Sequence, residues 1–85
     1  MKQVEIYTTP ICGFCMAAKR LLASKNVPFI EYDVMSNPAK RTEMTQRSKG
    51  GRTVPQIFIG GQHVGGSDEL HLLDRQNKLD TLLAI

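Results

Sequence analysis

Between Gln3 and Val34 the sequence shows the pattern of a strand, then of a helix, then of a second strand. This order constrains the fold more than any other feature of the chain. Gln3 to Thr8 alternates apolar and polar residues, which predicts a strand. Phe14 to Lys25 follows a helical period, with apolar side chains sharing one side: Phe14, Ala18, Leu21 and Leu22. Pro28 to Val34 is rich in aromatic and branched residues and predicts a second strand. Such a strand–helix–strand unit makes the two strands parallel.

The second half of the chain predicts a helix, a hairpin and a last helix. Asn37 and Pro38 are typical of a helix start, and Gly50-Gly51 should end that helix near Lys49. Gly60-Gly61 separates two short strand patterns, residues 56–59 and 62–64, which is a hairpin signal. Ser67 is then expected to cap a last helix with an apolar side made of Leu70, Leu73, Leu79, Leu82 and Leu83.

These elements follow the order β-α-β-α-β-β-α. The hairpin adds antiparallel strands to the parallel pair, so we expect an α/β fold with a four-stranded mixed sheet and flanking helices. A length of 85 residues fits one domain, residues 1–85. The acidic Glu5 and the lack of an apolar stretch before the first strand indicate no signal peptide, so a cytoplasmic location is expected. The net charge of +3 gives little support for nucleic-acid binding, and no apolar stretch is long enough for a membrane span.

The chain has two cysteines: Cys12 follows the first predicted strand, at the start of the first predicted helix, and Cys15 lies three residues further along. The first N–H groups of a helix have no hydrogen-bond partner within the helix, and the N-terminal end of the helix dipole is positive. Both effects favour a thiolate at this position. Cys15 falls on the same helical face, within reach for a disulfide. Since the thiolate attacks in thiol–disulfide exchange and a second thiol resolves the mixed disulfide, we predict Cys12 as the nucleophile and Cys15 as the resolving thiol.

Two other interpretations of the cysteine pair are less consistent with the sequence. A structural zinc site needs four ligands, and only His63 and His71 remain, without the spacing of a zinc finger. Inert cysteines at a helix end are disfavoured by the CxxC spacing within a strand–helix–strand unit. We therefore expect no metal site made by this chain alone.

With the cysteine pair placed, nearly all of the chain resembles a glutaredoxin of the small bacterial dithiol type, on a thioredoxin-like fold. Three separated segments carry the resemblance: Tyr7-Thr8-Thr9-Pro10-Ile11-Cys12-Gly13-Phe14-Cys15, Arg52-Thr53-Val54-Pro55-Gln56-Ile57-Phe58-Ile59, and Gly65-Gly66-Ser67-Asp68. The resemblance implies a glutathione-dependent oxidoreductase of cell redox homeostasis that reduces protein–glutathione mixed disulfides and protein disulfides. It implies glutathione as a cosubstrate, no tightly bound cofactor, and a monomer.

The resemblance also implies where glutathione lies. Pro55 would be cis, which exposes the backbone of Val54 to an extended thiol peptide. The γ-glutamyl carboxylate would meet the N–H groups of Ser67 and Asp68, and Arg52 or Lys49 would help to hold the glycyl carboxylate. The implied glutathione-binding residues are Phe14, Arg52, Thr53, Val54, Pro55, Gly66, Ser67 and Asp68.

The active-site tetrapeptide departs from the commonest family pattern. Dithiol members usually have CPYC, whereas Gly13-Phe14 stands here, and many members have a lysine where this chain has Thr9. CGFC differs by one residue from the CGFS of monothiol glutaredoxins, which assemble [2Fe–2S] clusters with glutathione. The alternative function is therefore a cluster-binding or carrier protein, in which Cys12 of two protomers and two glutathiones bridge the cluster. A third alternative, thioredoxin, is disfavoured by the lack of any tryptophan and by the Gly65-to-Asp68 segment.

Overall fold

A computed structural model describes all residues, 1–85. The strands are β1 (Val4–Thr8), β2 (Ile30–Asp33), β3 (Gln56–Ile59) and β4 (Gln62–Gly65). The helices are α1 (Gly13–Ser24), α2 (Pro38–Arg47), α3 (Ser67–Arg75) and α4 (Leu79–Leu83). The α/β fold that the sequence predicts is confirmed, with one more helix than expected.

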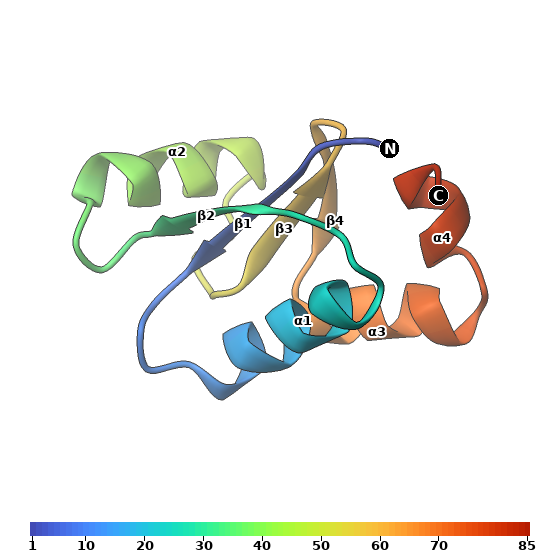
Figure 1. Cartoon of the computed structure of the whole chain (residues 1–85). Helices are drawn as coiled ribbons and strands as arrows, with labels where there is room; N and C mark the ends of the chain where they lie inside the picture. Colours follow the sequence, from blue (N-terminus) through green and yellow to red (C-terminus); the bar gives the residue numbers. More distant parts are fainter.

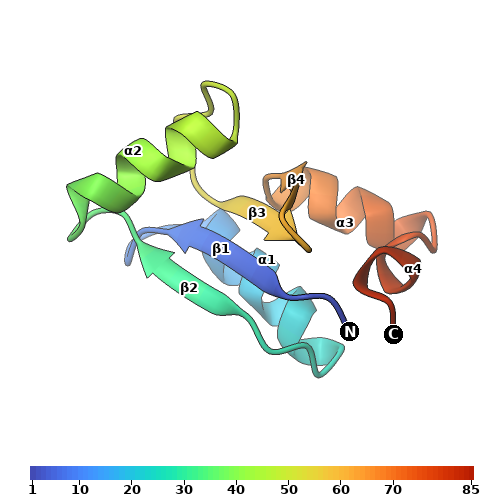
Figure 2. The same cartoon turned by 90° about the horizontal axis from the view of Figure 1, so that it is seen from above.

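The four strands form one mixed sheet in the order β2-β1-β3-β4 (Figure 2). β1 pairs in parallel with β2, with Ile6 opposite Glu31. β1 also pairs with β3, and β3 with β4, in the antiparallel sense. β1 therefore lies inside the sheet, and its carboxyl end leads directly into the cysteine pair.

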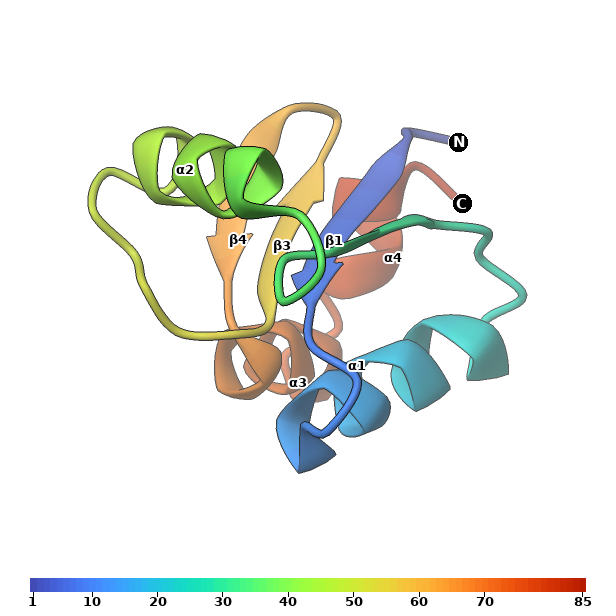
Figure 3. The same cartoon turned by 90° about the vertical axis from the view of Figure 1, so that its left-hand side faces the viewer.

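The helices cover the two faces of the sheet unequally. α1 and α3 pack on one face and α2 lies on the other, as Figures 1 and 3 show. The face under α1 and α3 holds the larger apolar cluster, whose members are Val4, Ile6, Ala18, Leu22, Val27, Ile57, Ile59, Leu70, Leu79 and Leu83. The face under α2 holds a smaller cluster: Tyr7, Val34, Met44 and Phe58.

Local sequence signals explain where two of the helices begin. Cys12 caps α1, because its sulfur accepts the N–H of Cys15. Asn37 caps α2, where its side-chain oxygen accepts the N–H of Lys40 at 3.2 Å, and Pro38 occupies the first helical position.

Three expectations about the helices are wrong. Phe14 does not pack on the core with the other apolar residues of α1: it is 66% exposed, because it lines the hollow described below. Ser67 is not the cap of α3. Gly66 takes that position, and its N–H donates to the Glu69 carboxylate at 2.6 Å. The last helix is divided in two, because Asn77 adopts a left-handed φ of 58°, which ends α3 before Leu79 begins α4.

Candidate functional site

Cys12 lies in the turn between β1 and α1, at the N-terminal end of the helix. Its backbone is extended, and its Sγ accepts the N–H of Cys15 at 3.1 Å. The same Sγ lies 3.8 Å from the carbonyl oxygen of Val54, to which the thiol donates. Cys12 is half-buried, and both cysteines are free thiols. The Cys12 sulfur therefore lies at the positive end of α1 and accepts a backbone N–H there.

Cys15 occupies a different environment one turn further along α1. It is 1% exposed. Burial, followed by the hydrogen bond with Cys12, raises the pKa of the Cys15 thiol to about 12. Cys15 thus stays protonated at neutral pH, while Cys12 has the more accessible sulfur. The two thiols thus differ in exposure and in environment, and their roles as nucleophile and resolving thiol stay a prediction.

The segment before β3 brings a second group of predicted residues to the cysteine pair. The Val54–Pro55 peptide bond is cis, as the family resemblance implied. Thr53, Val54 and Pro55 form one wall of a hollow of about 300 Å³. This segment is far from Cys12 in sequence but close to it in space, because the Val54 carbonyl contacts the Cys12 sulfur.

The other walls of the hollow come from the first turn of α1 and the first turn of α3. Phe14 supplies the first, and Gly66, Ser67, Asp68 and Glu69 supply the second. The N–H groups in the first turn of a helix have no partner within the helix and attract anions. Asp68 and Glu69 add negative charge beside them, so this wall can receive a carboxylate and an ammonium group together.

Glu69 is the lining residue that was absent from the predicted site. It reaches the hollow because its carboxylate accepts the Gly66 N–H and closes the cap of α3. The sequence carried a signal for it, since a glutamate at the third helical position commonly bonds back to the capping residue. A helix capped by Ser67 would have Leu70 at the third helical position, so the expected cap did not indicate this hydrogen bond.

Arg52 and Lys49, the residues expected near the glycyl carboxylate, do not line this hollow. Arg52 lines a separate hollow with Arg41, Thr42, Thr45 and Gln46, on the α2 side of the molecule. Its carbonyl oxygen accepts from Arg41 Nη1 at 3.4 Å. The seven other predicted glutathione contacts gather around the hollow beside Cys12.

The structure assembles no group of three or more His, Cys, Asp and Glu side chains able to hold a metal ion. His63 and His71 belong to other interactions, with Gln56 and with the carbonyl oxygen of Ser67 respectively. A metal at Cys12 would therefore need ligands from outside this chain. None of the helices has both the length and the apolar character that crossing a membrane requires.

Comparison with known proteins identifies related chains over almost the whole length. The glutaredoxin family model matches residues 4–64. Glutaredoxin 3 of Escherichia coli strain K12 is 54% identical over 83 residues, which are 98% of this chain and 99% of the relative. The crystal structure of a buckwheat glutaredoxin–glutathione complex superposes with a TM-score of 0.88 at 28% identity, over 98% of this chain and 77% of that one.

A further solved structure, titled "Metal Binding of Glutaredoxins", is 53% identical to this chain. It superposes with a TM-score of 0.74 and covers 98% of this chain and 89% of that one. The chain's fold and its sequence thus point to the same group of proteins.

Proposed function

The chain belongs to the glutaredoxin family of thiol–disulfide oxidoreductases, and we propose that it reduces protein–glutathione mixed disulfides and protein disulfides with glutathione as cosubstrate. The observation that supports this most is the position of the Cys12 sulfur. It lies at the edge of a hollow whose far wall is the anion-attracting first turn of α3. A tripeptide thiol with a carboxylate at each end suits such a hollow.

We propose that glutathione spans the hollow from α3 towards Arg52. Its γ-glutamyl carboxylate meets the N–H groups of Ser67 and Asp68, and the Asp68 carboxylate accepts from its ammonium group. Its cysteinyl backbone runs beside Val54 as an added strand would. The glycyl carboxylate extends towards the loop with Arg52, whose guanidinium makes no ion pair within this chain.

In the first step the Cys12 thiolate attacks the glutathione sulfur of a protein–glutathione mixed disulfide. A bond forms between the two sulfurs, the old S–S bond breaks, and the protein leaves as a thiolate that takes up a proton. A second glutathione thiolate then attacks glutathionylated Cys12, giving oxidised glutathione and free Cys12 thiolate. Cys15 takes no part in this route.

Protein disulfides follow a route that uses both cysteines. Cys12 attacks one sulfur of the substrate and forms a mixed disulfide, and Cys15 then attacks Cys12 and releases the substrate as a dithiol. The Cys12–Cys15 disulfide that remains is reduced by two glutathiones. Both routes need reduced glutathione, which fits a reducing compartment such as the cytoplasm.

Single cysteine variants test this division of labour. Cys12→Ser should abolish turnover of both substrate types, because serine does not provide a thiolate. Cys15→Ser should keep the reduction of a glutathionylated peptide but lose the reduction of a protein disulfide. Turnover is measured with glutathione, glutathione reductase and NADPH. Activity of Cys12→Ser, or loss of both activities in Cys15→Ser, would contradict the assignment.

A second candidate function is the binding of a [2Fe–2S] cluster between two copies of the chain. Cys12 supplies a thiolate of the kind that holds such clusters, while buried Cys15 does not. Gly13 leaves open space beside Cys12, since a Cβ built there would meet no atom within 4 Å. Two Cys12 thiolates and two glutathione thiolates make up a four-thiolate set.

Anaerobic reconstitution with iron, sulfide and glutathione tests this second function. We expect visible absorbance that coelutes with a dimer in the wild-type chain, and neither in Cys12→Ser. A Gly13→Pro variant should lower the yield of the coloured dimer, because proline fills the space beside Cys12. A colourless monomer from the wild-type chain would contradict this function without affecting the first.

A further inference from the structure

The side chain of Gln56 links the wall of the hollow to the edge strand of the sheet. Gln56 is the first residue of β3 and is only 6% exposed. Its Nε2 donates to the carbonyl oxygen of Thr53 at 3.0 Å and to the Thr53 hydroxyl at 3.3 Å. Its Oε1 lies 2.6 Å from Nε2 of His63 on β4. One buried carboxamide therefore joins the Thr53 segment to a residue that lies outside the hollow.

The chemistry of the partners determines how this carboxamide is oriented. The Thr53 carbonyl oxygen only accepts hydrogen bonds, so the NH₂ group of Gln56 must face it. The Oε1 of Gln56 then faces His63, whose Nε2 must carry a proton and donate. The His63 ring is held in turn by stacking on Phe58, with 4.9 Å between ring centroids. His63 thus selects the orientation in which Gln56 binds Thr53.

The bond to Thr53 also sets the direction of the next backbone donor. The Thr53–Val54 peptide bond is trans, so its C=O and N–H point in opposite directions. With the Thr53 carbonyl drawn inwards by Gln56, the Val54 N–H points away from Gln56. This N–H donates to no group of the protein. A free donor therefore stands on the wall of the hollow, on the residue whose carbonyl contacts Cys12.

We propose that Gln56 and His63 are positioning residues that hold the Val54 N–H in the direction needed to bind the cysteinyl carbonyl of the thiol substrate. The inference rests on the proposed function, because it assumes that a glutathionyl group occupies the hollow. Neither side chain touches the reacting sulfurs. They act through the Thr53–Val54 peptide plane, with His63 orienting Gln56 and Gln56 orienting the peptide.

Two mixed disulfides of one peptide separate this role from a merely structural one. The first carries glutathione, whose cysteinyl carbonyl can accept from Val54, and the second carries cysteamine, which has no carbonyl. Single-turnover rates of the reduced chain are measured with each. In Gln56→Leu and in His63→Leu the rate with the glutathione disulfide should fall about five- to tenfold, the effect of one misdirected hydrogen bond. The rate with the cysteamine disulfide should stay within twofold.

Matched variants complete the test. His63→Gln keeps an N–H donor beside Gln56 and should restore most of the glutathione rate. Gln62→Leu makes the same type of change on the neighbouring, exposed residue of β4 and should alter neither rate. The positioning role would be overturned if Gln56→Leu and His63→Leu lowered the rates with both disulfides equally. It would also be overturned if His63→Leu, a change at an exposed residue, lowered neither rate. A wild-type chain that does not favour the glutathione disulfide would contradict the proposed function itself.

Discussion

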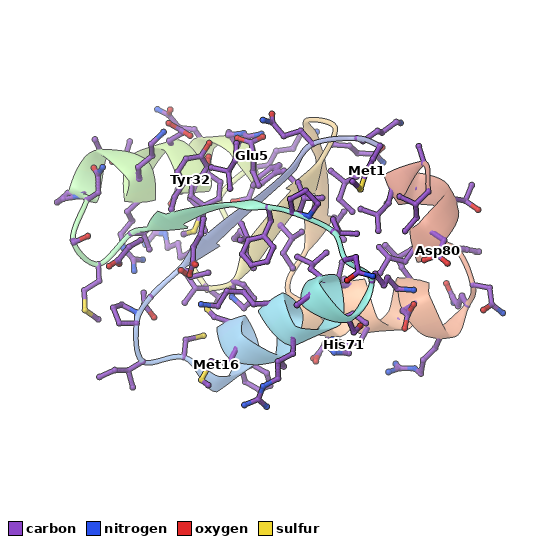
Figure 4. The ribbon with its side chains drawn as sticks, viewed as in Figure 1. Met1, Glu5, Met16, Tyr32, His71 and Asp80 are labelled. Carbon is purple, nitrogen blue, oxygen red and sulfur yellow. The ribbon has the colours of Figure 1, made fainter.

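The two faces of the sheet are held by different interactions, although the same strands supply both. Towards α1 and α3 the strands present aliphatic side chains such as Val4 and Ile6, within a cluster of ten buried apolar residues. Towards α2 they present aromatic and charged ones. Figure 4 shows Glu5 and Tyr32 near α2, where the Tyr32 hydroxyl donates to Glu5 at 2.9 Å. The alternation of side chains along β1 thus divides the stabilising interactions between two kinds of chemistry.

Arg47 is the centre of the charged face. Its guanidinium donates to both carboxylate oxygens of Glu5, at 2.9 and 3.0 Å, and to the Tyr7 hydroxyl at 2.7 Å. It also lies 4.0 Å from the centre of the Phe58 ring. Tyr7 in turn donates to Glu43 on α2. Helix α2 is therefore attached to the sheet by a network of mutually dependent polar pairs, in addition to the packing of its buried Met44.

The two faces also support different parts of the candidate site. The apolar face holds α1 and α3, which carry the cysteine pair and the first turn with Ser67. The charged face holds α2, which leads into the segment with Thr53 and Val54. The cysteine pair therefore lies on the face held by the larger apolar cluster, whereas Val54 packs against the smaller cluster, which polar pairs join to α2. Changes to each face should therefore have separable effects.

The largest effect on stability is expected from a change on the apolar face. Leu22→Ala removes a fully buried side chain from α1 and leaves a cavity, which costs about 2–5 kcal/mol. Urea unfolding measures the free energy change. The matched control is Leu72→Ala, because Leu72 is 45% exposed on α3, and its change should stay within about 0.5 kcal/mol. Equal effects of the two variants would contradict the proposed division.

A smaller effect is expected on the charged face. Arg47→Met removes the partner of Glu5 and leaves that half-buried carboxylate with Tyr32 as its remaining hydrogen-bond donor, which costs about 1–3 kcal/mol. Replacing both partners, in Glu5→Leu with Arg47→Met, should restore part of the loss, because no charge is then left unpaired. Urea unfolding of the two single variants and the double variant measures the coupling. Additive losses would show that the two side chains do not act as a pair.

The smallest effect is expected from acid. The Arg47 hydrogen bonds hold the pKa of Glu5 below its usual 4.5, and the Tyr7 hydrogen bond holds the pKa of Glu43 below that value. A lowered folded-state pKa contributes stability above the unfolded pKa and loses it as the pH falls through the folded value. The free energy of unfolding should therefore decline below about pH 4.5. In the Glu5→Leu, Arg47→Met double variant the free energy of unfolding should decline less at low pH. A decline equal to that of the wild-type chain would show that other carboxylates cause the effect.

Most of the architecture could be predicted from the sequence, because each element carries a strong local signal. The alternation in β1, the Asn37-Pro38 start of α2 and the Gly60-Gly61 turn each indicate one local conformation. The division of the last helix was missed because leucines continue in helical spacing past Asn77, whose left-handed backbone ends the helix. Leucine spacing reports which side is apolar, but it does not report a break between two helices.

Only the parts of the candidate site that belong to recognisable motifs could be predicted from the sequence. Cys12, Cys15 and the Thr53-to-Pro55 segment lie where the family resemblance implied. Gln56 and His63 were not predicted, because each is ordinary in its strand and the link between them exists only when β3 and β4 pair. Arg52 belongs to a different hollow, which depends on how the loop after α2 folds back on that helix.

The burial of Cys15 has a consequence for competition between the two proposed routes. The raised pKa of the Cys15 thiol keeps it protonated at neutral pH, so few molecules hold it as a thiolate. Its closeness to Cys12 offsets this deficit, because a well-oriented intramolecular group acts at a high effective concentration. Free glutathione has no such advantage and competes only through its concentration. Raising the glutathione concentration should therefore increase the share of intermediates at Cys12 that leave through the one-cysteine route.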